Sequence, residues 1–493
     1  MMQYREVNRM KISRIMSGIE YELIQGCDKQ KATSMEIDSR KVEPGGIYIA
    51  ISAITLDRHL FIGNAAVNGA VAAIIDRDQE DYPEGMCVIK VANARKSWAT
   101  MCANFYDHPE AKLRLYGVTG TNGKTSVTYI MQSILKNAGL IGTVGLSLGD
   151  KLIKIPFDTS TTPDPPELMQ IFDYMHKNGA KDVIMEVSSH ALALHKMEGL
   201  HFEVAMFTNL TQDHLDFHGT MENYLAAKAK LFGQCRFGVV NTDDKYSPQI
   251  MTIGNPERWI TYGIDKKCDI QAVHIEDRAD GSAFDVEIDG KMENFYLPVK
   301  SRFNIYNALA CIGAALVTGI SVEQIRNGLA SFKGVPGRIQ SIPNDKGFEV
   351  LVDYAHSPDS LVNIINAVRT FTNGKLVTVF GCGGDKDTDK RPKMGRIAGT
   401  LSDHCILTSD NPRSEPPEAI IDQIEEGIKD TDCPYNKFVD RREAIFAGIA
   451  MLEPGDALII AGKGHEDYQI IGSEILHFDD VEVAKEALAT LCN

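Results

Sequence analysis

The feature that most constrains this chain is a glycine-rich loop between a strand and a helix. Residues 115–126 read LYGVTGTNGKTS, and their apolar start is typical of a buried strand. Glycine lets the backbone approach a phosphate group, and the first turn of the helix offers free N–H groups and a partial positive charge. The usual P-loop pattern, GxxxxGK followed by Ser or Thr, requires glycine at the position of Val118. This loop is therefore a variant that uses Gly120. A chance match is the alternative, but the order strand, loop and helix favours a nucleotide phosphate site.

Side chains in and near this loop are candidates for the chemistry. Lys124 can reach the outer phosphates, and Thr125 can ligate Mg²⁺. Glu186 lies near the end of the strand predicted at 182–187, where a carboxylate suits Mg²⁺; a solvated glutamate at a strand end is the alternative. His214 follows the next strand and could bind a metal or a phosphate, although a lone histidine is more often structural.

The length of 493 residues indicates several domains, because one hydrophobic core stops growing beyond about 250–300 residues. At roughly 150 residues a domain, we expect about three. Short strands and turns over residues 1–97 predict a small N-terminal α/β domain. Strands alternate with helix-length stretches over residues 98–332, which predicts a central parallel sheet carrying the phosphate loop. A similar alternation over residues 333–493 predicts a C-terminal Rossmann-like domain, so the fold class is α/β.

In this last block a polar cluster follows each predicted strand. The strands are 348–352, 376–380, 404–408 and 457–460, and the clusters are 353–356, 381–387, 408–413 and 461–466. Open parallel sheets bind ligands at the carboxyl ends of their strands, so these clusters predict a second site. Ordinary surface turns rich in Gly, Asp and Asn are the alternative.

The composition excludes several classes of protein. Lys and Arg number 51 against 67 Asp and Glu, and this net charge of −16 argues against a nucleic-acid-binding protein. The continuous apolar segment Ala308–Val317 is far shorter than the ~20 residues that span a bilayer. Residues 1–15 carry scattered charges and no apolar signal core, so we expect a cytoplasmic protein without membrane insertion. The ten cysteines form no CxxC pair, as expected of reduced thiols.

Several short motifs occur in an order that carries a resemblance. They are the loop at 119–126, EVSSH at 186–190, DHLD at 213–216, YLAAK at 224–228, FNIYN at 303–307, PGR at 336–338 and DYAH at 353–356. Over most of the chain this order resembles the Mur ligases. DSR at 38–40 and DNPR at 410–413 are similar to the members of that family that form the muramoyl-tripeptide. DNPR also resembles the signature of the members that add meso-diaminopimelate.

The resemblance implies an ATP-dependent amide ligase of peptidoglycan precursor synthesis. A carboxylate of UDP-N-acetylmuramoyl-L-alanyl-D-glutamate would be phosphorylated by ATP, and the amine of a diamino acid would attack the acyl phosphate. Metal ions and Lys124 would neutralise the crowded anions. The residues that match ATP-binding positions are Gly120, Thr121, Asn122, Gly123, Lys124, Thr125, Ser126, Asn304, Arg338 and Asp353.

The resemblance also implies the metal ligands and the catalytic residues. Thr125, Glu186 and His214 match Mg²⁺ sites, and Lys228 matches a lysine that is carbamylated in the family. A carbamate turns this cation into an anion that can hold a second Mg²⁺. Lys124, Lys228 and His214 are therefore the expected catalytic residues. From the residues alone, a solvated helix lysine is the alternative for Lys228.

The UDP-sugar substrate is expected to contact the first domain at Ser39. A plain turn or helix cap is the alternative for Asp38 and Ser39. The other residues that match positions for this substrate are Ser160, Thr161, Thr162, Ser188 and Lys196. Leu194 and Lys196 stand where a glutamine and an arginine are expected, which puts contacts to this substrate in question.

The amino-acid substrate is expected at the clusters of the last block. The matching residues are Lys386, Asp410, Asn411, Arg413, Gly462 and Glu466. The far end of meso-diaminopimelate carries a carboxylate as well as an ammonium, whereas L-lysine has only the ammonium. A guanidinium such as that of Arg413 pairs with this carboxylate and repels the ammonium of lysine. A pair between Arg413 and Glu415 is the alternative.

Other functions remain open at this stage. A ligase with another acceptor would add L-lysine, or glutamate as in folylpolyglutamate synthase. A P-loop regulatory ATPase would hydrolyse ATP without the muramoyl-dipeptide and the diamino acid. We expect a monomer whose partners are UDP-N-acetylmuramoyl-dipeptide and a diamino acid.

Overall fold

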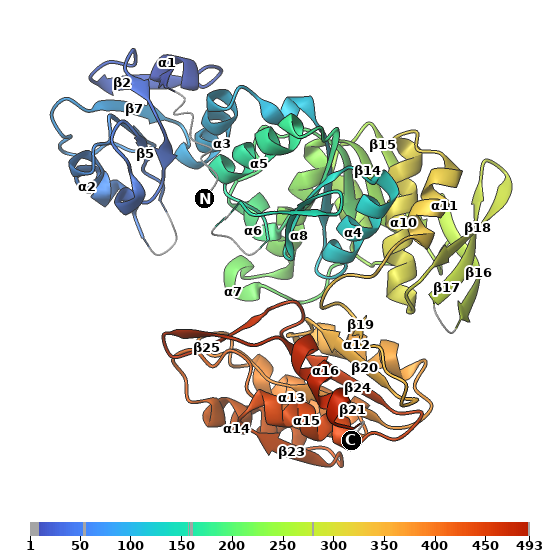
Figure 1. Cartoon of the computed structure of the whole chain (residues 1–493). Coiled ribbons are helices and arrows are strands. Elements are labelled where there is room, and N and C mark those ends of the chain that lie inside the picture. Colours follow the sequence, from blue (N-terminus) through green and yellow to red (C-terminus); the bar gives the residue numbers. More distant parts are fainter. Residues whose placement is uncertain (1–8, 53–55, 156, 158–160, 279–280, 492–493) are drawn as a thin grey trace.

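The computed structural model describes residues 9–52, 56–155, 157, 161–278 and 281–491. Its strands form three large sheets that follow one another along the chain. Figure 1 shows the N-terminal sheet in blue, the central sheet in green and yellow, and the C-terminal sheet below them in orange and red. The α/β fold class predicted from the sequence is confirmed.

The N-terminal sheet contains a short parallel core. In spatial order its strands are β2 (Tyr21–Gln25), β7 (Cys87–Val91), β6 (Ala72–Ile75), β5 (Ile47–Ile49) and β4 (Met35–Glu36). Only β2 runs antiparallel to its neighbour. A separate pair joins β1 (Met10–Lys11) to β3 (Lys31–Ala32). The helices are α1 (Ile12–Ile15), η1 (Ser39–Lys41), η2 (Arg58–Phe61), α2 (Ile62–Val67) and α3 (Ala94–Phe105).

Helix α3 connects this sheet to the central one. Its N-cap is Asn93, whose side-chain oxygen accepts a hydrogen bond from the backbone N–H of Lys96 at 2.9 Å. The helix packs against β5 and β7 on one side and against α5 (Pro165–Lys177) of the central domain on the other. The predicted boundary between residues 97 and 98 falls inside α3, and the domain limits stay a prediction.

Within the described residues, the central sheet has eleven strands. In spatial order they are β11 (Lys151–Ile153), β10 (Gly145–Leu148), β9 (Gly139–Gly142), β12 (Asp182–Glu186), β8 (Arg114–Thr119), β13 (Phe202–Phe207), β14 (Cys235–Asn241), β15 (Arg258–Gly263), β16 (Ile270–Arg278), β17 (Gly281–Ile288) and β18 (Lys291–Leu297). In this spatial order the seven strands from β9 across to β16 are parallel. The strands at both edges, β10 and β11 on one side and β17 and β18 on the other, are joined by antiparallel pairing. The phosphate-loop strand β8 lies between β12 and β13, so the carboxyl ends of these three strands meet.

Helices connect and cover these strands. Besides α5 they are η3 (Pro109–Lys112), α4 (Lys124–Leu135), α6 (Ser189–Ala193), α7 (Leu215–His218), α8 (Met221–Ala229), η4 (Lys230–Gly233), α9 (Ser247–Ile253), α10 (Arg302–Val317) and α11 (Val322–Ala330). Most of α10 is buried against α4, β14 and β15, which explains why this segment is almost free of charge. Within the described residues, no helix is long and apolar enough to cross a membrane.

The C-terminal sheet places the four predicted polar clusters at one edge. In spatial order its strands are β19 (Gln340–Ser341), β20 (Glu349–Asp353), β24 (Ala457–Ala461), β21 (Leu376–Phe380), β22 (His404–Thr408) and β23 (Tyr435–Phe438). From β20 to β23 the strands are parallel. A separate hairpin joins β25 (Tyr468–Ile471) to β26 (Glu474–His477). The helices are α12 (Pro358–Arg369), α13 (Lys390–Leu401), α14 (Pro417–Ile428), α15 (Arg441–Ala450) and α16 (Asp480–Thr490).

Candidate active site

The phosphate loop is built around two glycines with positive φ. Strand β8 ends at Thr119 and α4 begins at Lys124, with Gly123 as its N-cap. The φ angles of Gly120 and Gly123 are +156° and +87°. A Cβ atom at Gly120 would overlap the hydroxyl of Thr208, and one at Gly123 would overlap the side-chain oxygen of Asn307. Only glycine fits either position, as expected of a loop that approaches phosphate closely.

Two lysines share the carbonyl oxygen of Gly120. The Nζ of Lys124 donates to it at 3.0 Å and to the carbonyl of Thr121 at 2.9 Å. The Nζ of Lys228, on α8, donates to the Gly120 carbonyl at 2.8 Å and lies 4.4 Å from the ring centre of Tyr224. Within the described part of the chain, no ion pair joins either lysine to a carboxylate. The ammonium group of Lys124 is thus left available for an anion, and among the described residues Lys228 has no carboxylate to compensate a positive charge.

Lys228 is not a solvated helix residue. It is 1% exposed, so that alternative is wrong. Burial lowers the pKa of Lys228 well below its usual value, and the nearby charge of Lys124 lowers it further. Burial also lowers the pKa of Lys124, with Glu186 and Asp213 acting in the opposite direction.

Glu186 ends β12 beside the phosphate-loop strand. Its Cα is paired with Val118 of β8, and the residue is 1% exposed, so a solvated strand end is also wrong. Its carboxylate accepts hydrogen bonds from the backbone N–H of Thr143 at 2.9 Å and from the Thr143 hydroxyl at 3.2 Å. The carboxylate is therefore oriented before any ligand binds.

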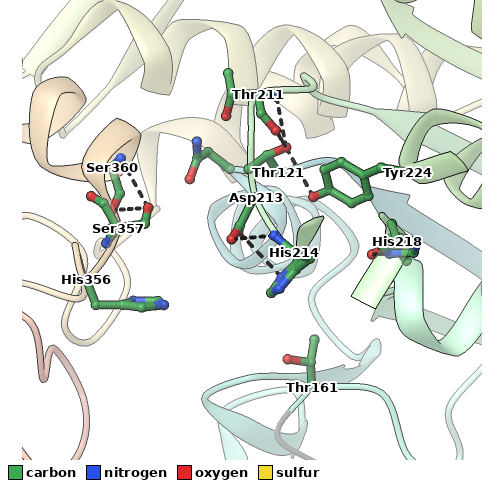
Figure 2. Close-up of polar contacts among 12 residues, drawn as sticks. Thr121, Thr161, Thr211, Asp213, His214, His218, Tyr224, His356, Ser357 and Ser360 are labelled. Carbon is green, nitrogen blue, oxygen red and sulfur yellow. Dashed lines mark hydrogen bonds and ion pairs between the residues drawn. The ribbon is translucent and has the colours of Figure 1, made fainter. Parts of the chain in front are cut away.

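His214 lies in a group of three imidazoles. It has a φ of +53°, and its Nε2 is 3.5 Å from a carboxylate oxygen of Asp213. Its ring centre is 4.8 Å from that of His190, which is 5.5 Å from that of His218. Burial lowers the pKa of His190 and of His218 to about 4, so both are neutral at pH 7. In Figure 2, His214 lies next to Asp213 below Thr121, and His218 lies next to Tyr224.

One cleft of about 560 Å³ brings most of the predicted ATP and metal residues together. The predicted residues that line it are Thr121, Asn122, Gly123, Lys124, Thr125, Ser126, Thr161, Glu186, His214, Asn304, Arg338 and Asp353. Gly120 precedes Thr121 of this lining in the chain, and Lys228 is joined to Gly120 by a hydrogen bond. The opposite wall comes from the C-terminal domain, and Figure 2 shows His356, Ser357 and Ser360 there.

Two charged residues lie where the chain enters the C-terminal domain. Asp353 accepts hydrogen bonds from the backbone N–H groups of Ile339 and Ala355, both at 2.8 Å, and burial raises its pKa. The guanidinium of Arg338 lies 4.6 Å from the ring centre of Tyr354, and its buried Nε has no hydrogen-bond partner among the described residues. Arg338 therefore keeps donor capacity for a ligand.

The donors in the cleft fit a magnesium ion. Thr125 and Glu186 offer a hydroxyl and a carboxylate, the hard oxygen ligands that Mg²⁺ prefers. Within the described residues, no group of three or more His, Cys, Asp and Glu side chains could hold a metal alone. This fits Mg²⁺, which usually takes one or two carboxylates and completes its shell with phosphates and water.

The predicted UDP-sugar residues do not form one cluster. Ser39 is buried in η1, and Asp38 caps this short helix through the backbone N–H of Arg40 at 3.0 Å, so the cap predicted as an alternative is present. Thr162 donates to Ser188 at 3.2 Å, and the hydroxyls of Thr161 and Thr143 are 3.1 Å apart. Lys196 forms an ion pair with Asp164 at 2.5 Å. Ser160 lies outside the described residues.

The predicted amino-acid residues gather at the ends of β22 and β24. The side-chain N–H of Asn411 donates to Glu466 at 2.9 Å, and a Cβ at Gly462 would lie 2.6 Å from a carboxylate oxygen of Asp410. Arg413 donates through Nη1 to the carbonyl of Gly384 at 2.9 Å. Lys386 is exposed on the loop after β21.

The alternative partner of Arg413 is occupied elsewhere. Glu415 accepts from both terminal nitrogens of Arg391, at 2.8 and 2.9 Å. Among the described residues, Arg413 forms no ion pair. The alternative in which Arg413 pairs with Glu415 is therefore wrong, and the guanidinium remains available for a carboxylate of a substrate.

The hairpin β25–β26 holds the loop that carries Arg413. The side chain of Gln469 donates to the carbonyl of Asp410 at 2.7 Å, and the N–H of Ile470 donates to the Asn411 side-chain oxygen at 2.9 Å. The N–H of Arg413 donates to the carbonyl of Ile470 at 3.1 Å, and the N–H of Gly472 donates to the Arg413 carbonyl at 2.7 Å. These bonds hold Arg413 at a φ of +52°.

Sequence reasoning missed the buried charges behind this cluster. Lys463 is fully buried beside Asn411 and Glu466. Arg441 forms a buried, two-fold hydrogen-bonded pair with Asp480, at 2.8 and 2.7 Å, and also donates to the carbonyl of Ala461 at 3.0 Å. The position of Lys463 within a cluster that follows a strand was a usable signal, whereas no local pattern links Arg441 to Asp480.

Comparison with known proteins identifies the family. Residues 118–315 match the Mur ligase middle domain, and residues 337–464 match the glutamate ligase domain of Mur ligases. The chain is 44% identical over 485 residues to UDP-N-acetylmuramoyl-L-alanyl-D-glutamate–2,6-diaminopimelate ligase of Caldanaerobacter subterraneus subsp. tengcongensis, covering 97% of this chain and 99% of the relative. The ligase of the same name from Clostridioides difficile is 44% identical over 491 residues, covering 98% and 100%.

Solved structures agree with the sequence matches. A structure of a ligase of that name has a TM-score of 0.69 and 31% identity, covering 98% of this chain and 100% of its own. MurF ligase from Thermotoga maritima, in complex with ADP, shares the fold with a TM-score of 0.60 and 18% identity, covering 93% and 97%. The order of motifs along the sequence predicted this relationship, and the chain belongs to the Mur ligase family.

Proposed function

We propose that this chain is an ATP-dependent ligase that joins meso-diaminopimelate to UDP-N-acetylmuramoyl-L-alanyl-D-glutamate in peptidoglycan precursor synthesis. The names of the relatives at 44% identity support this reaction. The observation that carries it is the position of Tyr354. Its ring lines the phosphate cleft, and its hydroxyl donates to Glu466 of the amino-acid cluster at 3.5 Å. An amino acid held by that cluster lies beside the phosphate cleft, as an amide-forming ligase requires.

The reaction needs two covalent steps. A carboxylate oxygen of the D-glutamate attacks the γ-phosphorus of ATP, and ADP leaves. The amine of the diamino acid then attacks the carbonyl carbon of the acyl phosphate, a C–N bond forms, and inorganic phosphate leaves as the amine loses a proton. The loop N–H groups and Lys124 stabilise the charge that develops on the transferred phosphoryl group.

Magnesium fits the proposal through the donors already described. Thr125 and Glu186 would hold the ion, with His214 beside them, and the bound ion would neutralise phosphate oxygens. Within this chain, Glu186 is oriented for that task by Thr143, and Lys124 supplies the cation that meets the phosphates.

Carbamylation of Lys228 is part of the proposal. A neutral amine adds to carbon dioxide to give a carbamate and one proton. The lowered pKa of the Lys228 ammonium raises the fraction of neutral amine, and burial protects the product from water. The carbamate would then replace a positive charge by a negative one next to Lys124.

The acceptor preference rests on Arg413. Its guanidinium has backbone partners and no carboxylate among the described residues, so it can bind the far carboxylate of meso-diaminopimelate. The same charge would repel the ammonium of L-lysine. Glu466 would bind the far ammonium of meso-diaminopimelate. We also expect a monomer that works in the cytoplasm, where ATP is available.

The test is a phosphate-release assay with UDP-N-acetylmuramoyl-L-alanyl-D-glutamate and a panel of amino acids. We expect phosphate release to require both substrates and to be fastest with meso-diaminopimelate. Release that is independent of the two substrates would indicate a regulatory ATPase instead. Equal or faster turnover with L-lysine would overturn the proposed acceptor.

A further inference from the structure

Lys463 is a buried cation between two acids of the amino-acid cluster. It follows β24, its side chain is 0% exposed, and its Nζ lies 3.8 Å from Asp410 and 3.5 Å from Glu466. A buried ammonium is costly unless other groups compensate its charge and its hydrogen-bond donors. Its position therefore indicates a role in arranging its neighbours.

The first neighbour that Lys463 arranges is the side-chain amide of Asn411. The oxygen of this amide accepts from the N–H of Ile470 at 2.9 Å and from the Nζ of Lys463 at 3.3 Å. Both groups are donors only, so the amide oxygen must face them. The amide nitrogen must then face Glu466, to which it donates at 2.9 Å.

The second neighbour is the carboxylate of Glu466. Burial and the nearby charge of Asp410 raise its pKa, and Lys463 and Asn411 oppose that shift. One carboxylate oxygen receives the donors of Asn411 and Lys463, while the other faces the hydroxyl of Tyr354 at 3.5 Å. Among the described residues this second oxygen has one donor, at 3.5 Å, so it keeps more capacity to accept from an ammonium group of a ligand.

We propose that Lys463 is a positioning residue for the amino-acid substrate, acting through the orientation of Asn411 and the negative charge of Glu466. The inference rests on the proposed function and deepens it. Lys463 itself need not touch the substrate. Its loss should weaken binding of the diamino acid and leave the phosphate half of the reaction intact.

The experiment separates the two halves of the reaction. Hydroxylamine replaces the diamino acid and traps the acyl phosphate as a hydroxamate, so the first step is measured alone. The variants are Lys463→Met, which removes the charge and the donors, and Lys463→Gln, which keeps a donor for Asn411. Lys429→Met is the matched control, because this lysine pairs with Glu425 on the exposed surface of the same domain.

We expect both Lys463 variants to form hydroxamate with a KM for ATP within about twofold of the unmodified enzyme. The KM for meso-diaminopimelate should rise at least tenfold in Lys463→Met and less in Lys463→Gln, with the control unchanged. The ligation rate of each sample is divided by its rate of hydroxamate formation, so a partly unfolded sample cannot imitate the effect.

Two results would overturn the role of Lys463. One is a folded Lys463→Met variant whose KM for meso-diaminopimelate stays within threefold. The other is equal loss of hydroxamate formation and ligation in a folded variant, as a general structural role would produce. If Lys463→Met does not fold, the same two results are sought with Lys463→Gln, for which a KM change below twofold is the limit. Absence of hydroxamate with the unmodified enzyme would instead contradict the proposed function.

Discussion

The phosphate cleft and the amino-acid cluster each lie at the carboxyl ends of parallel strands, one on the central sheet and one on the C-terminal sheet. They differ in whether their buried cations are paired with carboxylates. In the phosphate cleft, Lys124 and Lys228 donate to backbone carbonyls and form no ion pair within the described residues. In the amino-acid cluster, Lys463 lies between two acids, and behind it Arg441 pairs with Asp480. Arg413 is the exception, since among the described residues only backbone carbonyls accept its donors.

This difference fits the ligand that we propose for each site. A polyphosphate brings several negative charges, so a cation without a carboxylate partner, such as Lys124, can bind it directly. A zwitterionic amino acid brings charges of both signs, so its site needs oriented groups of both signs that are largely balanced before binding. We therefore expect charge changes in the first site to alter catalysis, and those in the second to alter stability and choice of acceptor.

The largest expected effect is on stability, from Asp480→Ala. This change leaves the buried charge of Arg441 without its partner, and breaking a buried pair costs about 3–5 kcal/mol. A chain with several domains does not unfold in one step, so the measurement is hydrogen exchange at the amides of β22 and β24. Faster exchange is expected there and not in β8. Unchanged exchange in β22 and β24 would remove the contrast between the two sites.

Lys124→Ala should have the next largest effect, and on catalysis alone. Loss of a preorganised group that stabilises developing charge lowers kcat by about 10²–10³-fold. Exchange in β8 and α4 should stay near that of the unmodified enzyme. Lys177→Ala, which removes a surface ion pair with Asp173, is the control. Near-normal phosphate release by a folded Lys124→Ala variant would disprove the assignment.

Lys228→Ala tests whether the second lysine acts as a carbamate. Groups that support a metal site contribute about 10–100-fold to activity. We expect a loss of that size, with partial recovery on addition of acetate, which can replace the missing anion. Chloride at the same concentration is the control for ionic strength. An unaltered rate, or no recovery with any short carboxylate, would count against a carbamate.

Arg413→Ala should change the choice of acceptor. A hydrogen bond to a charged group contributes ~1.5–3 kcal/mol, so kcat/KM for meso-diaminopimelate should fall by roughly one to two orders of magnitude. The value for L-lysine should not fall, because the charge that repels its ammonium is removed. Lys429→Ala is the control, because this exposed lysine pairs with Glu425 outside the cluster, and its loss should matter by less than about fivefold. An unchanged ratio of the two acceptors after Arg413→Ala would disprove the binding of the far carboxylate by Arg413.

The sequence predicted the strands and the ends that carry the sites. Strand–helix alternation located β20, β21, β22 and β24 to within one or two residues. This worked because buried parallel strands are short apolar runs, and because the polar residues after them are unusual. The sequence also indicated that Gly120 and Gly123 shape the phosphate loop. The structure agrees, because both have positive φ angles that favour glycine.

Partners of charged side chains were the part that could not be predicted. Residue type alone left Lys228 and Glu186 open as solvated residues, and both are 1% exposed. Proximity in sequence suggested a pair between Arg413 and Glu415, yet Glu415 is held by Arg391, which lies on α13. Burial and pairing depend on contacts between distant segments, which hydrophobic periodicity does not encode.

The hairpin β25–β26 has a consequence for how the acceptor site can evolve. Apart from Gln469, it holds the Arg413 loop through its own main chain, while Ile471, Ile475 and Leu476 remain 44%, 71% and 45% exposed. Most of its side chains can therefore drift without loosening the loop. A change in hairpin length or in the turn at Gly472 would shift Arg413 itself. New acceptor preferences are thus open to insertions and deletions in a peripheral ribbon, without any change in the sheet.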